Sequence, residues 1–288
     1  MYYFIYPFLY LISLLPFRVL YSLSDFIYLM LYKIFGYRKK VVHENLTRSF
    51  PEKSAQEIQS ITDKYYKNLC DSIVETIKLI SISKKELDRR MTCNWEVFDS
   101  MTSQNRNGQG YMSHQFNWEW GTLICNWHVP RRFTGLYMPL TNAAFEKLFL
   151  KIRGRAGMKL IRVQDMQKEM AAVQNEKTLW GFIADQNPSD PKRVSWNDFL
   201  NRKTAFFKGP EFVARRYNNL VYFGEFIKLK RGYYEIKMKL AFEHPKETKE
   251  GEITEAYVRF LEDSIKRQPE NWVWSHRRWK HIYPENSH

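Results

Sequence analysis

The sequence contains few of the residues that would indicate a fold held together by covalent cross-links or metal ions. It has three cysteines, Cys70, Cys93 and Cys125, which are widely separated and odd in number. This spacing differs from that of a disulfide framework and indicates reduced thiols in a cytoplasmic compartment, where we expect them to be small core residues. The histidines and cysteines also lack the spacing of metal-binding motifs, so we expect no metal site.

Long apolar runs, internal repeats and low-complexity segments are missing too. The most apolar segment, residues 1–17, has the sequence MYYFIYPFLYLISLLPF and carries no charge, but Pro7 and Pro16 interrupt it. A second apolar stretch covers residues 26–32. Neither is an unbroken span of about 20 apolar residues. The basic start and the small-residue cleavage site of a secretory signal peptide are also absent.

Three arrangements fit this N-terminal segment. It can form one short transmembrane helix, two helices lying in the membrane interface, or a helix pair buried in a soluble core. Tyrosine-rich flanks and the basic run 37–40 that follows are typical of a membrane interface with its basic side toward the cytoplasm. We therefore divide the chain into a membrane-associating helical segment, residues 1–35, and a larger domain, residues 36–288.

The chain is rich in positive charge and in aromatic residues. Its formal net charge is +14 and 16% of its residues are aromatic. An excess of positive charge attracts anionic partners, namely a phospholipid surface, an acidic protein or nucleic acid, and charge alone does not choose among them. The aromatic content is typical of a protein that works where apolar and aqueous surfaces meet.

The pattern of apolar residues predicts an α/β fold. Ser54 to Glu57 form a capping box, and apolar residues then recur at helical spacing up to residue 80. Further on, predicted strands alternate with amphipathic helices, and the last helix covers residues 252–268. The predicted strands are 109–113, 133–138, 158–162, 178–184, 220–226 and 233–242. This order favours a central mixed, largely parallel sheet flanked by helices, with the functional site where strands end and helices begin.

Residues 113–120, SHQFNWEW, directly follow the first of these strands and contain the most informative pair of side chains. His114 and Glu119 would point about 140° apart on one helix and to opposite faces of one strand, so they meet only across a turn. We predict such a turn, with Glu119 orienting His114 as a general base. Ser113 faces away from its neighbour on a strand, which argues against a serine nucleophile. Cys125 could react only if the fold brought it back to the site.

Further segments extend this pattern along the chain. They are Glu44 to Pro51, Arg153 with Gly157, Asp185-Gln186 after an apolar strand, and residues 272–280, WVWSHRRWK. Together with the histidine segment, they resemble the lipid A biosynthesis acyltransferase family, the late lauroyl and myristoyl transferases. That family lies within a wider group of lysophospholipid acyltransferase-like enzymes in which four residues separate a histidine from an acidic residue. The resemblance covers almost the whole chain.

The resemblance implies roles for individual residues. His114 is similar to the catalytic base of the family and Glu119 to its partner. The implied substrate-binding residues are Asn117, Arg153, Asp185, Arg277 and Arg278. Arg153 would bind a phosphate or assist catalysis, although a solvated charge is an equal alternative, and a turn residue is an alternative for Asp185. The tryptophans of 272–280 would form a lipid-facing or phosphate-binding rim or a structural staple.

The resemblance also implies an activity. A fatty acyl chain would move from an acyl thioester, on acyl carrier protein or coenzyme A, to a hydroxyl group of a membrane lipid such as a lipid A precursor. Apart from this thioester co-substrate we expect no cofactor, and no nucleic acid as partner. The site would face the cytoplasm from the inner membrane. The sequence departs from the family pattern at two positions. Phe116 stands where the family often has glycine, which implies a differently built turn and a reshaped acyl pocket. Met138 stands where many members have arginine, which keeps an aminolipid or lysophospholipid open as the acceptor.

Two rival functions share the same residues. A thioesterase or lipid hydrolase would use the same base with water as the acceptor. A basic membrane- or nucleic-acid-binding protein without enzymatic activity would use the arginines and tryptophans of 272–280. The sequence has no phosphate-cradling glycine loop and no recognisable nucleic-acid module, which disfavours nucleic acid as its target.

Overall fold

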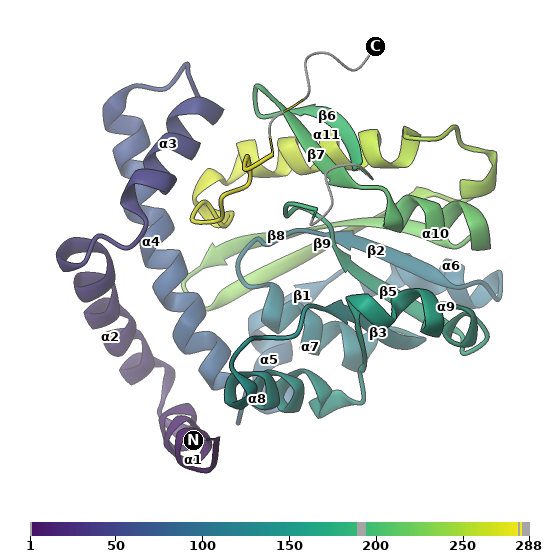
Figure 1. Ribbon diagram of the computed structural model, residues 1–288. Helices are drawn as coiled ribbons and strands as arrows, with labels where there is room; N and C mark the ends of the chain where they lie inside the picture. The colour runs from purple at the N-terminus through teal and green to yellow at the C-terminus, as the bar shows by residue number, and fades with distance from the viewer. Residues whose placement is uncertain (1, 189–193, 282, 284–288) are drawn as a thin grey trace.

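A central sheet brings together strands from distant parts of the sequence (Figure 1). The computed structural model describes residues 2–188, 194–281 and 283. In spatial order, the seven strands are β1 (Met91–Cys93), β9 (Tyr233–Phe242), β8 (Leu220–Lys230), β2 (Gly108–Met112), β5 (Thr178–Ile183), β3 (Arg132–Tyr137) and β4 (Lys159–Arg162). Neighbouring strands are parallel except β8 and β9, which are antiparallel. The predicted α/β fold with a mixed, largely parallel sheet is confirmed.

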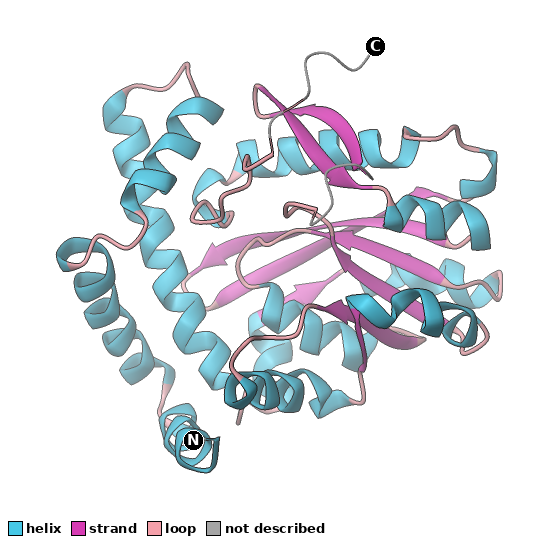
Figure 2. Ribbon diagram, in the orientation of Figure 1, coloured by secondary structure: helices cyan, strands magenta, loops and turns pink. Residues whose placement is uncertain are grey.

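Helices cover both faces of this sheet (Figure 2). On one face pack α5 (Lys84–Arg90), α6 (Asp99–Ser103), α7 (Trp118–His128) and α8 (Ala143–Arg153), and on the other α10 (Gly209–Tyr217) and α11 (Glu252–Arg267). Strand β8 shows why two layers form. Leu220 and Tyr222 join the apolar cluster of α7, whereas Val221 and Phe223 join that of α11. Because successive side chains of a strand face opposite ways, a strand that is apolar throughout needs a cover on each side.

The remaining predicted elements also form, within a few residues of their expected bounds. Helix α4 (Ala55–Lys78) begins with the predicted capping box, in which Ser54 Oγ accepts from the Glu57 amide and Glu57 Oε2 accepts from the Ser54 amide. Helix α9 (Met166–Gln174) connects β4 to β5. Short 3₁₀ helices complete the described chain: η2 (Trp95–Phe98), η3 (Gly154–Ala156), η4 (Val163–Asp165), η5 (Pro245–Glu247) and η6 (Pro269–Asn271).

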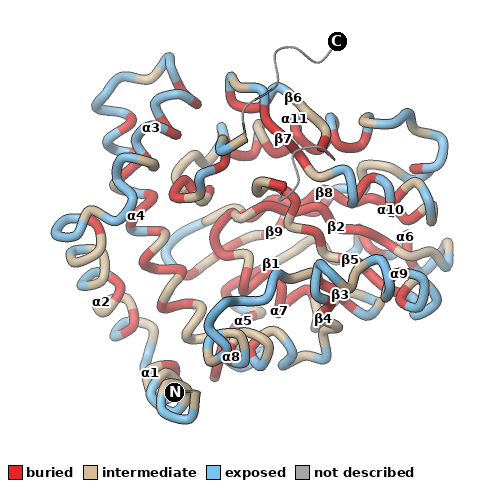
Figure 3. The backbone as a smooth tube through the Cα atoms, in the orientation of Figure 1, coloured by how far each residue is buried: buried red, intermediate tan, exposed pale blue. Residues whose placement is uncertain are grey.

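The N-terminal helices lie along one side of α4 (Figure 1). They are α1 (Tyr2–Leu14), α2 (Phe17–Tyr28), the π-helical η1 (Leu29–Ile34) and α3 (Lys39–Ser49). Figure 3 shows that α1 and α2 are largely exposed or half-buried. Their exposed apolar side chains include Phe4, Phe8, Leu11 and Phe26. In the described part of the chain no single helix has the length and apolar character to cross a membrane. Residues 2–14 and 17–34 meet that test only together, as a pair bent by 118°.

One pair of strands is not predicted by the sequence patterns described above. Strands β6 (Val194–Phe199) and β7 (Arg202–Phe207) form an antiparallel hairpin that packs against α11. Its turn contains Leu200 and Asn201, with φ of 49° and 64°. Glycine is the usual residue for such backbone conformations, and its absence here hides the turn in the sequence.

Candidate active site

Two neighbouring strands end with a histidine and an aspartate. Strands β2 and β5 are parallel and in register, with Met112 opposite Ile183. His114 and Asp185 each lie two residues beyond this pair, so the two chains deliver them to the same edge of the sheet. His114 Nδ1 lies 2.6 Å from Asp185 Oδ1, and the His114 backbone N–H donates to Asp185 Oδ2 at 2.9 Å.

Asp185 is buried among hydrogen-bond donors. The Trp272 indole N–H donates to Asp185 Oδ2 at 2.7 Å, so this carboxylate accepts from three N–H groups. Burial alone would raise the pKa of Asp185, but the charge of His114 and these hydrogen bonds outweigh it and hold the pKa below its ordinary value. The carboxylate is therefore ionised at neutral pH.

This ionised carboxylate decides the tautomer of His114. A carboxylate only accepts, so Nδ1 of the neutral imidazole carries the proton and Nε2 is left with a free lone pair. The His114 side chain is 18% exposed, whereas that of Asp185 is 1% exposed. His114 also lines a cavity. The pair therefore presents a basic nitrogen, oriented by a buried anion, to a space that a substrate can enter.

Glu119 pairs with Arg153. The Arg153 guanidinium donates to both carboxylate oxygens, from Nε at 3.0 Å and from Nη2 at 2.5 Å. Glu119 lies in the first turn of α7 and Arg153 in the last turn of α8. Burial would lower the pKa of Arg153, but the Glu119 charge holds it above its ordinary value. Both side chains line the cavity that His114 lines, so a fixed cation lies in its wall.

The structure corrects the predicted partner of the histidine. We expected Glu119 to orient the imidazole, but in the described residues the imidazole Nδ1 bonds to Asp185 and Glu119 bonds to Arg153. The predicted strand–turn–helix junction does form. Strand β2 leads into residues 114–119, here called the 114–119 turn, and this turn leads into α7. The expectation about the partner is wrong because this turn directs Glu119 toward α8, while parallel pairing of β2 and β5 brings Asp185 to the ring.

The cavity has a volume of about 660 Å³, which lies within the range of about 300–1,000 Å³ typical of ligand sites. Its polar lining includes His114, Glu119 and Arg153, which come from the end of β2, from α7 and from α8. The rest of the wall is mainly apolar and includes Phe133, Leu136, Phe149, Leu150, Met158 and Phe182. A space of this kind suits a hydrocarbon chain whose reactive end lies at the polar groups.

Three other predicted substrate-binding residues have different surroundings. Asn117 is buried and caps α7, where its side chain accepts from the Trp120 amide, and it is not among the described residues that line the cavity. Arg278 is also buried and donates to Asn187 Oδ1 at 3.0 Å. Arg277 is exposed. Asn187 lines the cavity, so Arg278 lies one residue behind its wall.

Two potential nucleophiles are in poor positions to react. Ser113 is fully buried, and its hydroxyl donates to Gln115 Oε1 at 3.1 Å. Cys125 is buried in α7, and burial raises the pKa of its thiol to about 12. A thiol with such a pKa carries almost no thiolate at neutral pH. Direct attack by an acceptor on the substrate is therefore the simpler chemistry for this site.

Trp272 is a site residue whose partner the sequence analysis did not identify. It follows α11 and lies opposite Gln115 in an isolated antiparallel bridge. The Phe116 backbone N–H donates to Asn271 O at 3.0 Å, so the C-terminal tail supports the 114–119 turn. Trp272 and Trp274 are buried, which favours the structural staple over a lipid-facing rim. The only sign of this role in the sequence was the clustering of these tryptophans with Arg278.

Comparisons with known proteins agree with these features. The family described as "Bacterial lipid A biosynthesis acyltransferase" matches residues 1–281. The chain is 25% identical over 282 residues to the lipid A biosynthesis lauroyltransferase of Escherichia coli (strain K12), a match covering 94% of this chain and 89% of that protein. It is 23% identical over 272 residues to the lipid A biosynthesis palmitoleoyltransferase of the same organism, covering 92% and 86%. A lipid A biosynthesis acyltransferase of Shigella flexneri matches at the same level.

Proposed function

Because the chain belongs to the bacterial lipid A biosynthesis acyltransferase family, we propose that it transfers a fatty acyl group from an acyl thioester to a hydroxyl group of a lipid A precursor. The chain is an acyltransferase. The observation that carries the finer proposal is the hydrogen-bonded pair of His114 and Asp185 at the wall of a largely apolar cavity. It combines a general base with room for a fatty chain.

His114 acts as the base in this proposal. Its Nε2 takes the proton of the acceptor hydroxyl while the hydroxyl oxygen attacks the thioester carbonyl carbon. The carbon–sulfur bond then breaks, and the imidazolium returns the proton to the leaving thiolate. Asp185 holds the imidazole with Nε2 unprotonated and stabilises the imidazolium that forms.

Arg153 stabilises the negative charge that develops on the carbonyl oxygen. Its Nε and Nη2 are bound to Glu119, which fixes the guanidinium plane against the cavity. Within the described residues the other N–H groups of the same plane have no acceptor, so they can donate to the oxyanion or to a phosphate of the acceptor. Glu119 thereby acts on the reaction through Arg153 rather than through His114.

The acyl chain occupies the apolar part of the cavity. Phe133, Met158 and Phe182 contribute to its wall, and burial of a saturated chain stabilises the complex by about 0.8 kcal/mol per methylene. Acyl carrier protein and coenzyme A both carry fatty acids as thioesters. The net charge of +14 favours acidic acyl carrier protein as the donor.

The exposed N-terminal helices bring the site to its lipid acceptor. Their apolar side chains, together with an apolar hollow lined by residues including Phe26, Met30 and Phe35, suit insertion into the interface of the inner membrane. Basic residues at 38–40 follow directly and match the anionic cytoplasmic leaflet. In this arrangement the site faces the cytoplasm, where the thioester donors are made.

The test is an acyl-transfer assay with two matched histidine variants. Purified full-length protein is mixed with phospholipid vesicles containing a lipid A precursor, and with acyl carrier protein or coenzyme A thioesters, and the products are identified by lipid mass spectrometry. His128 Nε2 lies 2.7 Å from Asp88 Oδ1 in a half-buried pair, so His128→Ala removes a similar pair outside the cavity.

We expect an acylated lipid with wild type and with His128→Ala, and a loss of about 10²–10⁴-fold with His114→Ala. Free fatty acid as the sole product would contradict acyl transfer and indicate a thioesterase. Undiminished transfer by His114→Ala would remove the proposed base.

A further inference from the structure

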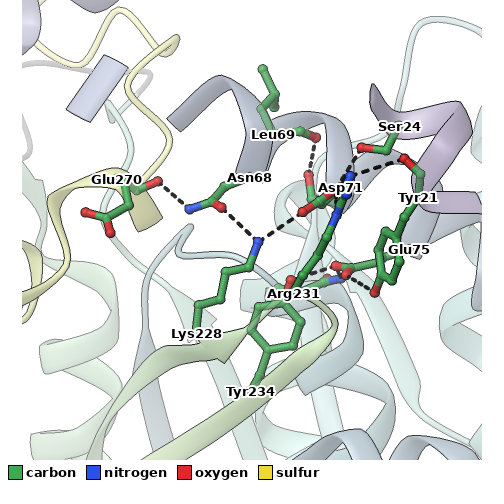
Figure 4. A network of polar contacts seen from close by, with 12 residues as sticks. Tyr21, Ser24, Asn68, Leu69, Asp71, Glu75, Lys228, Arg231, Tyr234 and Glu270 are labelled. Atoms are coloured by element: carbon green, nitrogen blue, oxygen red, sulfur yellow. Dashed lines mark hydrogen bonds and ion pairs between the residues drawn. The ribbon is translucent and has the colours of Figure 1, made fainter. Parts of the chain in front are cut away.

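A second buried carboxylate, which the proposed chemistry does not use, lies behind the 114–119 turn. Glu75 belongs to α4 and is fully buried. Its carboxylate accepts from the Tyr21 hydroxyl at 2.9 Å, from Asn117 Nδ2 at 2.9 Å and from the Tyr234 hydroxyl at 2.8 Å. These donors come from α2, from the 114–119 turn and from β9, so three separate parts of the fold meet at one side chain. Figure 4 shows Tyr21 and Tyr234 beside Glu75.

Asn117 links this carboxylate to the reacting groups. It lies between His114 and Glu119 and is the N-cap of α7, where its Oδ1 accepts from the Trp120 amide at 3.3 Å. The Trp120 indole N–H also donates to the Glu75 backbone carbonyl at 2.9 Å. Glu75 therefore holds both the last part of the turn and the first turn of α7.

A carboxylate in this place needs a reason beyond stability. Burial raises the pKa of Glu75, which reflects the cost of removing it from water. An apolar residue of similar size would avoid that cost, although it would leave Asn117 Nδ2 without an acceptor. The direction of the Asn117 side chain, and with it the start of α7 that carries Glu119, depends on this acceptor.

Asp71, one helical turn earlier on α4, provides the comparison. It is also buried and also joins distant elements, accepting from Ser24 Oγ at 2.8 Å, Arg231 Nη2 at 2.7 Å and Lys228 Nζ at 3.1 Å (Figure 4). These partners belong to α2 and to the β8–β9 hairpin. In the described part of the chain, Asp71 makes no hydrogen bond to the 114–119 turn. Both acids therefore join distant elements of the fold, and they differ in that only Glu75 also binds the 114–119 turn.

We propose that Glu75 is a positioning residue for acyl transfer, which sets the geometry of His114 and of the Glu119–Arg153 pair by holding Asn117. The inference rests on the proposed function of the site. Through the Tyr21 hydroxyl, the same carboxylate ties the turn to α2, the helix that carries exposed apolar residues. The turn is thus supported by the N-terminal helices on one side and by the C-terminal tail on the other.

The test reverses one hydrogen bond. Asn117→Asp keeps the oxygen that caps α7 but replaces the donor facing Glu75 with a second acceptor. Glu75→Gln alone retains an acceptor for Asn117, because its amide can turn toward the Tyr21 hydroxyl. In the double variant, the amide introduced by Glu75→Gln can donate to the new carboxylate, so the contact re-forms with donor and acceptor exchanged. Asp71→Asn is the control for damage to the same helix face.

The variants are compared as full-length protein by thermal unfolding, by kcat and KM in the vesicle assay, and by hydrogen exchange of the 114–120 amides. For Asn117→Asp we expect kcat to fall about 10- to 100-fold, because a displacement of about 1 Å in a site can cost that much, while KM for the donor changes less than about twofold. The double variant should recover kcat to within about threefold of Glu75→Gln, since the two changes are coupled. Asp71→Asn should lower thermal stability and keep kcat within about twofold of wild type.

Hydrogen exchange tests the positioning separately from the activity. Faster exchange at 114–120 in Asn117→Asp, reversed in the double variant, supports the inference even if the acceptor lipid proves to be a different one. Unchanged exchange, an unchanged kcat in Asn117→Asp, or a double variant no better than Asn117→Asp overturns it. Absence of acyl transfer by wild type would instead count against the proposed function.

Discussion

Replacing Asp185 with asparagine tests the orientation of the catalytic histidine with almost no change of shape. Asp185 Oδ2 accepts two N–H groups, from the His114 backbone at 2.9 Å and from Trp272 at 2.7 Å. The single oxygen of an asparagine is therefore held at this position. Its amide group then faces His114 Nδ1, which must accept, and the proton of the imidazole moves to Nε2. The nitrogen that faces the acceptor is no longer a base.

The expected loss follows from this change of tautomer. General base catalysis contributes about 10²–10⁴-fold, so kcat of Asp185→Asn should fall by that factor. At about 1.36 kcal/mol per tenfold change, the activation barrier rises by about 2.7–5.4 kcal/mol. The fold should survive, because the variant keeps the hydrogen bonds to the His114 backbone and to Trp272.

The assay is the initial rate of lipid acylation with saturating thioester, measured at equal concentrations of folded protein. Asp88→Asn is the control, because Asp88 Oδ1 lies 2.7 Å from His128 Nε2 in a half-buried pair outside the cavity. We expect the control to keep the wild-type rate. If Asp185→Asn retains more than about a tenth of the wild-type kcat, the carboxylate does not select the tautomer and the reasoning fails.

Three further predictions concern the same cavity. Arg153→Lys removes the two-point contact with Glu119, because an ammonium group is a point charge on a flexible chain, and kcat should fall about a hundredfold in the same assay. A side chain at Gly135 would clash with Met158 Cε, so Gly135→Val should push Met158 into the cavity. Competition between thioesters should then show a preference for shorter acyl chains, and an unchanged preference would place the chain elsewhere. The pKa of Asp185 is lowered in the folded protein, so its ionised form stabilises the fold above the unfolded pKa of about 3.9 and this contribution is lost as pH falls through the folded pKa. The difference in unfolding free energy between wild type and Asp185→Asn should therefore have its largest value at neutral pH and become smaller below about pH 4. Denaturant titrations that give the same difference across this pH range would contradict the prediction.

Local sequence patterns were sufficient for most elements of the fold. The capping box at Ser54 predicted the start of α4, because it is formed by residues three apart and needs no distant partner. Strand β2 was also predicted locally, from a short run that contains Tyr111 and Met112, and all five of its residues are buried, as expected for a strand inside a parallel sheet. The β6–β7 hairpin was missed because its turn, with positive φ at Leu200 and Asn201, contains no glycine.

The sequence analysis named the residues that meet at the cavity but not which of them pair with each other. His114, Glu119, Arg153 and Asp185 were all named from the sequence, and they lie at or directly behind the wall of one cavity. A carboxylate five residues away was the natural partner for His114 when only sequence distance was known. The actual partner, Asp185, is 71 residues away.

The sequence by itself determined the alternation of strands and helices, the residue types that carry the chemistry and the apolar N-terminus, since each of these depends on neighbours along the chain. Only the tertiary structure decided which acid orients the histidine and which one holds the arginine. The physical reason is the pairing of parallel strands: the in-register contact of β2 with β5 places His114 beside Asp185, while the first turn of α7 directs Glu119 to Arg153.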